Sequence, residues 1–365
     1  MIKVELAPTW RIVSNGQVRE MDLVLIAILG DLAETGKLTH AARFAGISHR
    51  HARNLINGWS EFFGSPLVVM QRGRGTSLTP VGERVLWAGR RIESRLAPEL
   101  DGLATDFARG INQALGMSAP SLVVHASHDF AVALLREYLQ QAGTSVELQS
   151  HGSFDALSSL LRGDCVVAGF HVPEGKLGDL MAARYSEILA GHAIRMFPLA
   201  RRSQGLIVPR GNPQQVMTVS DLAKPGVRFV NRQRGSGTRA LFESLLSEAH
   251  IDRRSISGYD TEEITHSAVA ALVAGRQADA GFGVKAAAAR FGLDFVPVMA
   301  ERYFLAVTET NADREDVKAM VVAASEPRYA DAVDGIPGYA SLRATGFVPA
   351  RDALGVSRVQ AKILH

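Results

Sequence analysis

The stretch Asn231-Arg232-Gln233-Arg234-Gly235-Ser236-Gly237-Thr238-Arg239 decides how the second half of this 365-residue chain is understood. It stands between an apolar segment at 227–230, which is predicted to be a strand, and a predicted helix at 240–246. A helix start offers unpaired N–H groups and the positive end of the helix dipole, and glycines let the backbone turn tightly before it. With three arginines and the hydroxyls of Ser236 and Thr238, the stretch is suited to hold an anion.

The alternative for this stretch is an ordinary glycine-containing turn in which Ser236 caps the helix. Nucleotide hydrolysis is not indicated, because the Gly-Lys-Ser/Thr ending of a Walker loop is missing.

Predicted strands and helices alternate from residue 121 onward. Strands are expected at 121–126, 146–150, 165–170, 205–209, 227–230, 279–282, 295–298 and 303–307, and helices at 129–141, 153–162, 178–190, 238–249, 265–275 and 313–325. Such alternation predicts parallel sheets that bind ligands at the carboxyl ends of their strands. Five polar clusters follow strands, at Ser127-His128-Asp129, Gly152-Ser153, His171, 231–239 and Thr265-His266. We therefore expect a cleft between two α/β lobes.

The N-terminal segment predicts a helix-turn-helix. After a helix at 21–32, Thr39 is expected to cap a short helix through Ala45, and Ser48 to cap a longer one that runs to about Phe63. Residues 67–78 read as two strands around a basic, glycine-rich turn, which would form a wing. Between residues 37 and 95 ten Lys and Arg face three acidic residues, which favours a polyanionic partner for this part of the chain.

A set of polar side chains is predicted to contact double-stranded DNA through phosphates and base edges. These candidates are Thr39, Ser48, His49, Arg50, His51, Arg53, Asn54, Arg72 and Arg74.

A long amphipathic helix is expected from Thr79 to about Leu115, mildly interrupted at Pro98, with a linker at 110–120. Because a helix of this length without a partner would leave its apolar stripe in water, the pattern predicts dimerisation.

Composition limits the class of protein. The one cysteine, Cys165, excludes an intrachain disulfide framework, and neither a signal peptide nor an 18-residue apolar span is seen, so we expect a cytoplasmic protein. His125 and His128 lack a third ligand at metal spacing, so no zinc site is expected. No nucleophile–base arrangement or Gly-x-Ser-x-Gly elbow is found, and we expect no enzyme.

Three segments of the N-terminal part carry a family resemblance: Gly36–Ser48, Phe63-Gly-Ser-Pro-Leu-Val68 and the run from Arg72 to Glu83. They resemble the winged helix of LysR-type transcriptional regulators and of the related molybdate-responsive ModE regulators. The usual LysR pattern has Leu-Phe after Gly-x-Pro, where this chain has Leu67-Val68.

The second half resembles the type 2 periplasmic-binding-protein fold, and more narrowly the PBP-like domain of molybdate-type proteins. The resemblance rests on 127–129, 201–208 with 211–213, 231–239, 262–270, and 292–297 before Glu301-Arg302-Tyr303. The same pair of domains occurs in LysR-type regulators of formate dehydrogenase genes. It implies a winged helix at 1–80, a linker and dimerisation helix at 81–120, and an effector-binding domain at 121–365. Lobe I would comprise about 121–200 and 305–365, and lobe II about 201–304.

The resemblance implies an effector site and an oligomer, a dimer or tetramer. The predicted ligand-binding residues are Ser127, His128, Ser153, Asn231, Arg234, Gly235, Ser236, Gly237, Thr238, Arg239, Thr265, His266 and Tyr303. Arg201, Arg202 and Gln204 are expected near the hinge as ties between the lobes. Molybdate or tungstate is the first candidate effector, formate the second and a pterin-type molybdenum cofactor the third; no further cofactor and no metal are expected. The rival function is a ligand store without DNA specificity.

Overall fold

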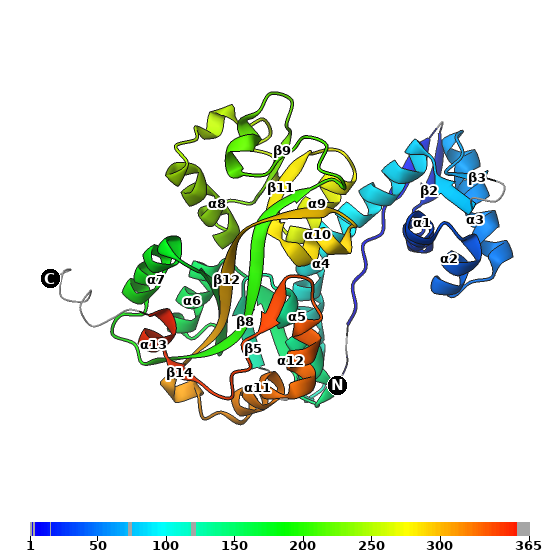
Figure 1. Ribbon diagram of the computed structural model, residues 1–365. Helices are drawn as coiled ribbons and strands as arrows, with labels where there is room; N and C mark the ends of the chain where they lie inside the picture. The colour runs from blue at the N-terminus through cyan, green and yellow to red at the C-terminus, as the bar shows by residue number, and fades with distance from the viewer. Residues whose placement is uncertain (1, 3, 15, 72–74, 118–121, 356–365) are drawn as a thin grey trace.

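The computed structural model describes residues 2, 4–14, 16–71, 75–117 and 122–355. A small N-terminal module, a long helix and a large two-lobed body follow one another along the chain (Figure 1). In the described part of the chain, no helix combines the length and the apolar character needed to cross a bilayer.

The N-terminal module is built from helices and two hairpins. Its elements are β1 (Arg11–Ser14), β2 (Gln17–Glu20), α1 (Leu23–Thr35), α2 (Leu38–Phe44), α3 (His49–Phe63), β3 (Val68–Gln71) and β4 (Gly75–Leu78). Ser48 caps α3 by accepting from the N–H of His51, as predicted. Trp59 lies at the centre of the module's core, with the guanidinium of Arg19 at 4.2 Å from its ring centroid.

Two expectations for this module need correction. Thr39 does not cap α2, because the helix already begins at Leu38 and Lys37 occupies the cap position without a side-chain hydrogen bond. The hairpin of β1 and β2 was not predicted, since its strands are only four residues long and partly exposed.

Helix α4 (Pro80–Ala114) begins at Thr79, which accepts from the N–H of Gly82, and continues through Pro98. It therefore takes up the first residues of the predicted linker, while 118–121 lie outside the described residues. It packs on α1 of the module and then on α9 and β6 of the body. Much of its surface is thus covered within the chain, whereas Leu103 and Phe107 remain exposed.

One mixed sheet runs through the whole body, in the order β10-β9-β11-β8-β12-β7-β5-β6. Its strands are β5 (Leu122–Ala126), β6 (Val146–Ser150), β7 (Val167–Pro173), β8 (Ile194–Val208), β9 (Phe229–Arg232), β10 (Glu262–Glu263), β11 (Ala280–Val284) and β12 (Asp294–Thr308), with β13 (Tyr339–Ser341) and β14 (Val348–Pro349) beside β8. β5, β6 and β7 pair in parallel in lobe I, as do β9, β10 and β11 in lobe II.

Two long strands, β8 and β12, pair antiparallel along their full length and join the lobes (Figure 1). The strands predicted at 295–298 and 303–307 are parts of the single strand β12, whose pairing with β8 shifts register on both sides of 299–303. The apolar pattern is interrupted there by Glu301 and Arg302, and Glu301 is buried against Arg202 and Gln204 of β8.

Helices cover both faces of the sheet. They are α5 (Phe130–Gln141), α6 (Ser153–Arg162), α7 (Lys176–Ile188), α8 (Gly237–Glu248), α9 (His266–Ala274), α10 (Lys285–Arg290), α11 (Glu315–Ser325), α12 (Pro327–Asp334) and α13 (Ala350–Leu354), with short 3-10 turns at Val219–Ala223, Arg253–Ser255 and Glu309–Asn311. The largest hydrophobic cluster extends from β5 and α5 in lobe I to α9 and α10 in lobe II, so the two lobes share one core.

Candidate functional site

A cavity of about 120 Å³ lies between the two lobes, at the ends of the parallel strands. It is lined by Ser127, His128, Ser150, His151, Gly152, Asp155 and His171 of lobe I, Arg202 of β8, and Arg232, Gln233, Arg234, Gly235, Ser236, Gly237, Thr238, Ile264 and His266 of lobe II. Among the described residues, eleven buried side-chain nitrogen or oxygen atoms have no hydrogen-bond partner, and five of them belong to residues of this lining. Buried polar groups are nearly always paired, so this concentration makes the cavity the candidate site for a polar ligand.

The loop between β9 and α8 has the predicted form. Gly235 turns the chain with a φ of 82°, and Ser236 caps α8 by accepting from the N–H of Arg239. The Ser236 hydroxyl donates to the carbonyl of Gln233 at 2.9 Å. The lobes approach closely at Gly237, where a Cβ would lie 2.5 Å from Nε2 of His171. The backbone of the helix start, rather than the Ser236 side chain, is therefore free to meet an anion.

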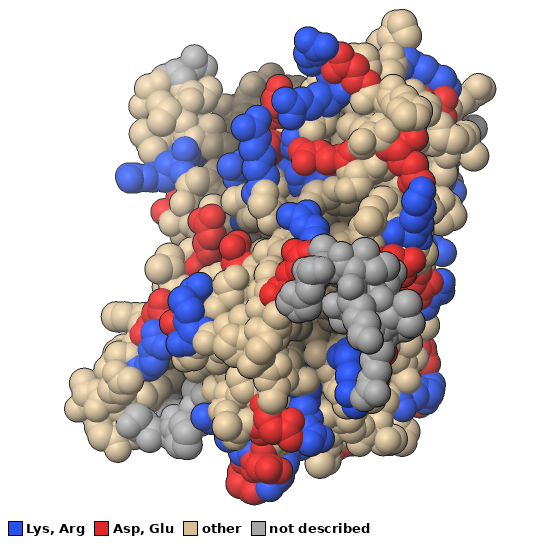
Figure 2. Space-filling view, turned by 90° about the vertical axis from the view of Figure 1, so that its left-hand side faces the viewer, with Lys and Arg blue, Asp and Glu red and all other residues tan. Residues whose placement is uncertain are grey.

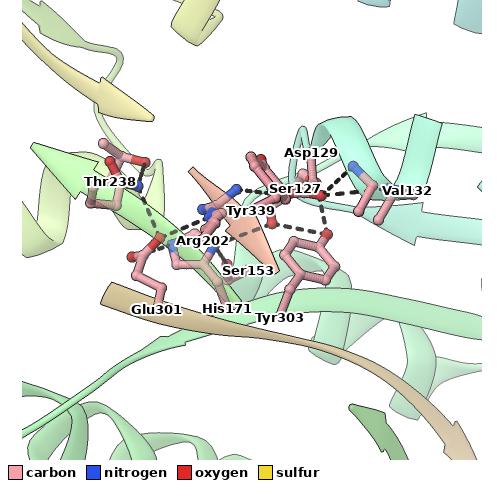
Figure 3. Close-up of polar contacts among 12 residues, drawn as sticks. Ser127, Asp129, Val132, Ser153, His171, Arg202, Thr238, Glu301, Tyr303 and Tyr339 are labelled. Carbon is pink, nitrogen blue, oxygen red and sulfur yellow. Dashed lines mark hydrogen bonds and ion pairs between the residues drawn. The ribbon is translucent and has the colours of Figure 1, made fainter. Parts of the chain in front are cut away.

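Arg202 is the centre of a buried polar network between the lobes (Figure 3). Its Nε donates to Glu301 at 2.9 Å and its Nη1 to Asp129 at 2.6 Å, and the side chain is 1 % exposed. Burial opposes the charge of Arg202, but Glu301 and Asp129 outweigh it and raise the pKa of the guanidinium. Arg202 therefore links β8, one of the two strands that join the lobes, to Asp129 of lobe I and to Glu301 of β12, and its role as a tie between the lobes stays a prediction.

In the described part of the chain, Arg232, at the end of β9, is buried without a carboxylate as hydrogen-bond partner, and only the charge of Glu263 partly compensates it. Its Nε and Nη2 donate to the backbone carbonyls of Glu263 and Ile264, and its Nη1 has no partner among the described residues. Burial, and then the charge of Arg202, lower the pKa of Arg232 to about 9. A buried cation that receives only carbonyl partners is costly, and an anion in the cavity would offset that cost.

Three histidines surround the same cavity in the neutral state. Burial lowers the pKa of His128 and of His171 to about 4 and, with Arg232 and Arg202, lowers that of His266 well below its usual range. Among the described residues, no group of three or more His, Cys, Asp or Glu is placed to hold a metal ion. The histidines therefore supply neutral N–H groups and lone pairs to the lining.

Eight predicted ligand residues line the cavity: Ser127, His128, Arg234, Gly235, Ser236, Gly237, Thr238 and His266. Of these, Arg234 is 76 % exposed and forms ion pairs with Asp260 and Glu262. Thr238 accepts from Nε2 of Gln204 at 3.2 Å.

The other five predicted ligand residues lie outside the lining and make contacts within the chain. Ser153 contacts His171, Asn231 donates to the carbonyl of Tyr259, and Tyr303 donates to the carbonyl of Ser127. Arg239 pairs with Glu243 and lies 4.2 Å from the ring centroid of Tyr259. Thr265 caps α9 and donates to the carbonyl of Ser94 on α4.

Nine residues of the lining were not among the predicted ligand residues, and three of these nine are buried: His171, Arg202 and Arg232. His171 lies within β7, opposite Tyr303 of β12, and Arg202 lies in the middle of β8. Arg232 belongs to the quoted loop itself, and its place as the last residue of an apolar strand was the available signal for burial.

A larger hollow of about 610 Å³ lies elsewhere, between residues 6–10, α1, α4 and the end of α10. None of the unpartnered buried atoms known in the described residues belongs to its lining. Its charged groups are partly paired, as Arg90 is with Glu34 at 3.6 Å. Chemistry therefore favours the smaller cavity as the ligand site.

The predicted DNA-contacting residues lie at α2 and α3. Thr39, Ser48, His49, Arg50, His51, Arg53 and Asn54 are all exposed, whereas Arg72 and Arg74 lie outside the described residues. Ala52, Ile56 and Trp59 are buried on the opposite face of α3. The face of the body opposite this module instead carries basic and acidic side chains side by side (Figure 2).

Most of the basic residues at 37–95 fall into two groups: exposed residues on α2 and α3, and arginines on α4 that contact other parts of the chain. Four of its arginines lie on α4 and are engaged within the chain. Arg84 donates to the carbonyl of Gly275, and Arg91 and Arg95 pair with Glu263 at 2.7 and 3.6 Å. Charge counting therefore overstated the basic surface available to a polyanion.

Helix α4 also contacts lobe I through a buried carboxylate. Arg109 donates to Glu147 of β6 at 2.8 Å, and Asp101 pairs with Arg136 of α5 at 3.3 Å. Glu147 is 2 % exposed and Glu263 is fully buried, so each lobe presents one buried carboxylate to arginines of the same helix.

Comparison with known proteins places this architecture. The model of the PBP superfamily domain matches residues 136–325. The chain belongs to the PBP superfamily. The predicted PBP-like fold is thereby confirmed, while the further link to regulators of formate dehydrogenase genes stays a prediction.

Individual proteins that are similar to this PBP superfamily protein share at most 28% sequence identity with it in the three examples that follow. The Bacillus subtilis (strain 168) protein YvgK, described as uncharacterized, is 28% identical over 209 residues, which are 57% of this chain and 68% of YvgK. CbnR, a LysR family transcriptional regulator, is 20% identical with a TM-score of 0.38, over 83% of this chain and 100% of CbnR. The tungstate ABC transporter from Geobacter sulfurreducens is 15% identical with a TM-score of 0.44, over 59% of this chain and 98% of the transporter chain.

Proposed function

We propose that this protein is a one-component transcriptional regulator that binds DNA through its N-terminal module and a small oxyanion through its PBP domain. The observation that carries the ligand part is Arg232, a buried guanidinium that lines the cavity with one nitrogen unpaired among the described residues. The start of α8 lies beside it and adds backbone N–H groups and the positive end of a helix dipole. No catalytic step is part of this proposal.

Molybdate or tungstate is the proposed effector. Donors approach the cavity from β9, from the start of α8 and from the histidines on its other sides, which suits a tetrahedral oxyanion. Formate remains the runner-up, because it carries one charge and fewer acceptor atoms. The cavity of about 120 Å³ speaks against a pterin-type cofactor, since pockets for larger ligands usually span about 300–1,000 Å³. Asn231 and Arg239 do not line the cavity and instead contact Tyr259 and Glu243.

Titration calorimetry with molybdate, tungstate, sulfate and formate tests the ligand proposal. We expect molybdate and tungstate to bind to the wild type, and Arg232→Met to weaken that binding at least 30-fold, or about 2 kcal/mol. Arg254→Met is the matched control, because Arg254 is an exposed arginine of the same lobe paired with Asp252. Equal affinities in the wild type and in Arg232→Met would contradict the assignment.

The DNA-binding part rests on the exposed start of α3. Ser48 to Asn54 carries two arginines and two histidines on the solvent side of a helix whose other face is buried. Together with the hairpin of β3 and β4, this arrangement has the elements of a winged helix-turn-helix.

Binding of the protein to duplexes from its own promoter region tests this part. Arg50→Ala and Arg53→Ala should each weaken specific binding by about 1–3 kcal/mol if they contact base edges. Binding should also fall steeply with salt because phosphate contacts release counterions. Arg162→Ala, in the exposed Arg162–Asp164 pair of the body, is the control. A ligand store, the rival function, predicts no preference over random duplex.

Oligomerisation through α4 stays part of the proposal. Leu103, Phe107 and Leu115 are 58%, 60% and 57% exposed at one end of the helix, although the rest of α4 packs within the chain. Apolar residues at this spacing favour contact with a second copy. Light scattering at micromolar concentration should therefore give a mass of at least twice 39.3 kDa, and a monomer would exclude the proposed dimer or tetramer.

A further inference from the structure

His171 occupies a position that no role has yet explained. It is 2 % exposed, and its Nδ1 lies 3.3 Å from both the Ser127 and the Ser153 hydroxyl oxygens. Its Nε2 lies 3.6 Å from Oε1 of Glu301, and neither of these two buried atoms has a hydrogen-bond partner among the described residues (Figure 3). One imidazole thus stands between a buried carboxylate and two hydroxyls that had been expected to bind the ligand.

The ring faces charged or titratable groups on every neighbouring element. These are Glu301 and Tyr303 of β12, Arg202 of β8, Asp129 at the start of α5, Arg232 of β9, His266 of α9 and Tyr185 of α7, whose hydroxyl donates to the His171 carbonyl. Burial lowers the pKa of His171, Glu301 raises it, and Arg202 lowers it further. For His128 and His266 the strongest influence after burial is instead the cation Arg232. His171 is therefore the histidine best placed to accept a proton.

The neutral ring restricts the serine hydroxyls. A neutral imidazole has one N–H, and the ionised Glu301 draws it to Nε2, which leaves a lone pair at Nδ1. Hydroxyl hydrogens then point to that lone pair, or from Ser127 to the Tyr303 oxygen at 3.2 Å, rather than into the cavity. Once Nδ1 carries a proton, it donates to the Ser127 oxygen, and the Ser127 hydroxyl can donate to a ligand.

We propose that oxyanion binding in this cleft is coupled to the uptake of one proton by His171, which turns Ser127 from a donor to the protein into a donor to the anion. The proposal rests on the proposed anion-binding function. A dianion beside the ring favours the imidazolium, and Glu301 on the other side stabilises the same charge. The proton comes from solvent and remains at Nδ1 while the anion is bound.

The coupling determines whether the affinity for the anion rises or falls with pH. The pKa of His171 in the free site is about 4, and a bound anion raises it. Between those two values the complex holds one proton more than the free protein, so affinity falls by up to tenfold for each unit of rising pH. A site with no linked proton would bind molybdate equally well over the range in which molybdate stays a dianion.

Calorimetric titration with molybdate in buffers of different ionisation enthalpy counts the protons directly. At about pH 6 we expect the wild type to take up close to one proton for each molybdate bound, with a smaller number at about pH 8. His171→Gln should reduce the number to near zero and remove most of the pH dependence. His192→Gln, an exposed histidine of the same lobe, should behave as the wild type.

The outcomes separate the two proposals. If molybdate and tungstate bind with no proton uptake in the wild type, the His171 coupling is wrong and the anion site stands. Unchanged proton uptake in His171→Gln would place the proton on another group and also overturn the coupling. If none of the anions binds to the wild type, the proposed function itself fails.

Discussion

Arg202 and Arg232 are both buried, at 1 % and 5 % exposure, yet they stand in contrasting surroundings. Arg202 lies between two carboxylates that neutralise it, whereas Arg232 receives only backbone carbonyls. The pKa of the first is raised and that of the second is lowered to about 9. A buried cation that hydrogen-bonds two carboxylates is compensated within the protein, whereas one that hydrogen-bonds only carbonyls would gain from an anionic ligand.

The sharpest test of this contrast is Arg202→Met. Removing the guanidinium leaves Asp129 and Glu301 buried without their cation, so we expect a loss of about 3–5 kcal/mol in the free energy of unfolding, measured with denaturant. Arg201→Met is the matched control, because Arg201 is the half-exposed neighbour paired with Glu174 and should cost less than about 1 kcal/mol. Similar losses for the two variants would contradict the structural role of Arg202.

Acid should weaken the cleft through its neutral histidines. His128 and His171 have folded-state pKa values of about 4, against about 6.5 in the unfolded chain. Because the unfolded chain binds protons first, stability falls as pH drops from about 6.5 towards 4, by about 2 kcal/mol for each histidine at pH 5. Unfolding in urea at several pH values measures the slope, and stability that stays constant between about pH 7 and 5 would rule out this account.

Arg232→Met should not lower the stability of the fold, in contrast to Arg202→Met. No carboxylate hydrogen-bonds to Arg232 among the described residues, so its removal relieves a buried charge, and we expect stability to stay equal or rise by about 1 kcal/mol. Molybdate affinity should nevertheless fall by about 2 kcal/mol or more. Thermal unfolding with and without molybdate compares the two effects, and a destabilised variant would remove the distinction between the two arginines.

The smallest effect is expected for Ser236→Ala. The hydroxyl caps α8 and donates to Gln233, so the substitution should cost about 1 kcal/mol of stability. Because that hydrogen is already donated within the loop, anion affinity should change much less than in Arg232→Met. Calorimetry of both variants measures the difference; a larger loss for Ser236→Ala would restore its hydroxyl as the main ligand donor.

Sequence reasoning located the loop at 231–239 and the polar strand ends, because both are local patterns of glycine, hydroxyl and apolar residues. It selected Arg239 over Arg232, since the sequence does not show that Arg239 turns to Glu243 and Tyr259. His171 was noticed as a polar strand end, but its pairing with Glu301 spans 130 positions and depends on the register of β7 and β12.

In the N-terminal helices, too, local sequence signals could be predicted, whereas long-range contacts could not. The Ser48 cap was predicted because serine before an amphipathic run is a local signal. The cap of α2 was predicted at Thr39, two positions after the actual cap residue Lys37, since lysine offers no such signal. The engagement of Arg84, Arg91 and Arg95 with the body depends on long-range packing that composition does not reveal.

The contacts of α4 with both lobes have a mechanical consequence. At about 1.5 Å per residue, the roughly 30 residues from Thr79 to Arg109 form a rod about 45 Å long. If lobe I moved against lobe II and tilted this rod by about 5°, the end nearest α1 would swing by about 4 Å, slightly more than the 3.4 Å between successive base pairs. A small hinge motion at the cleft would thus be magnified, by leverage alone, into a displacement of the N-terminal module, which amounts to about one base-pair step if that module binds DNA as proposed.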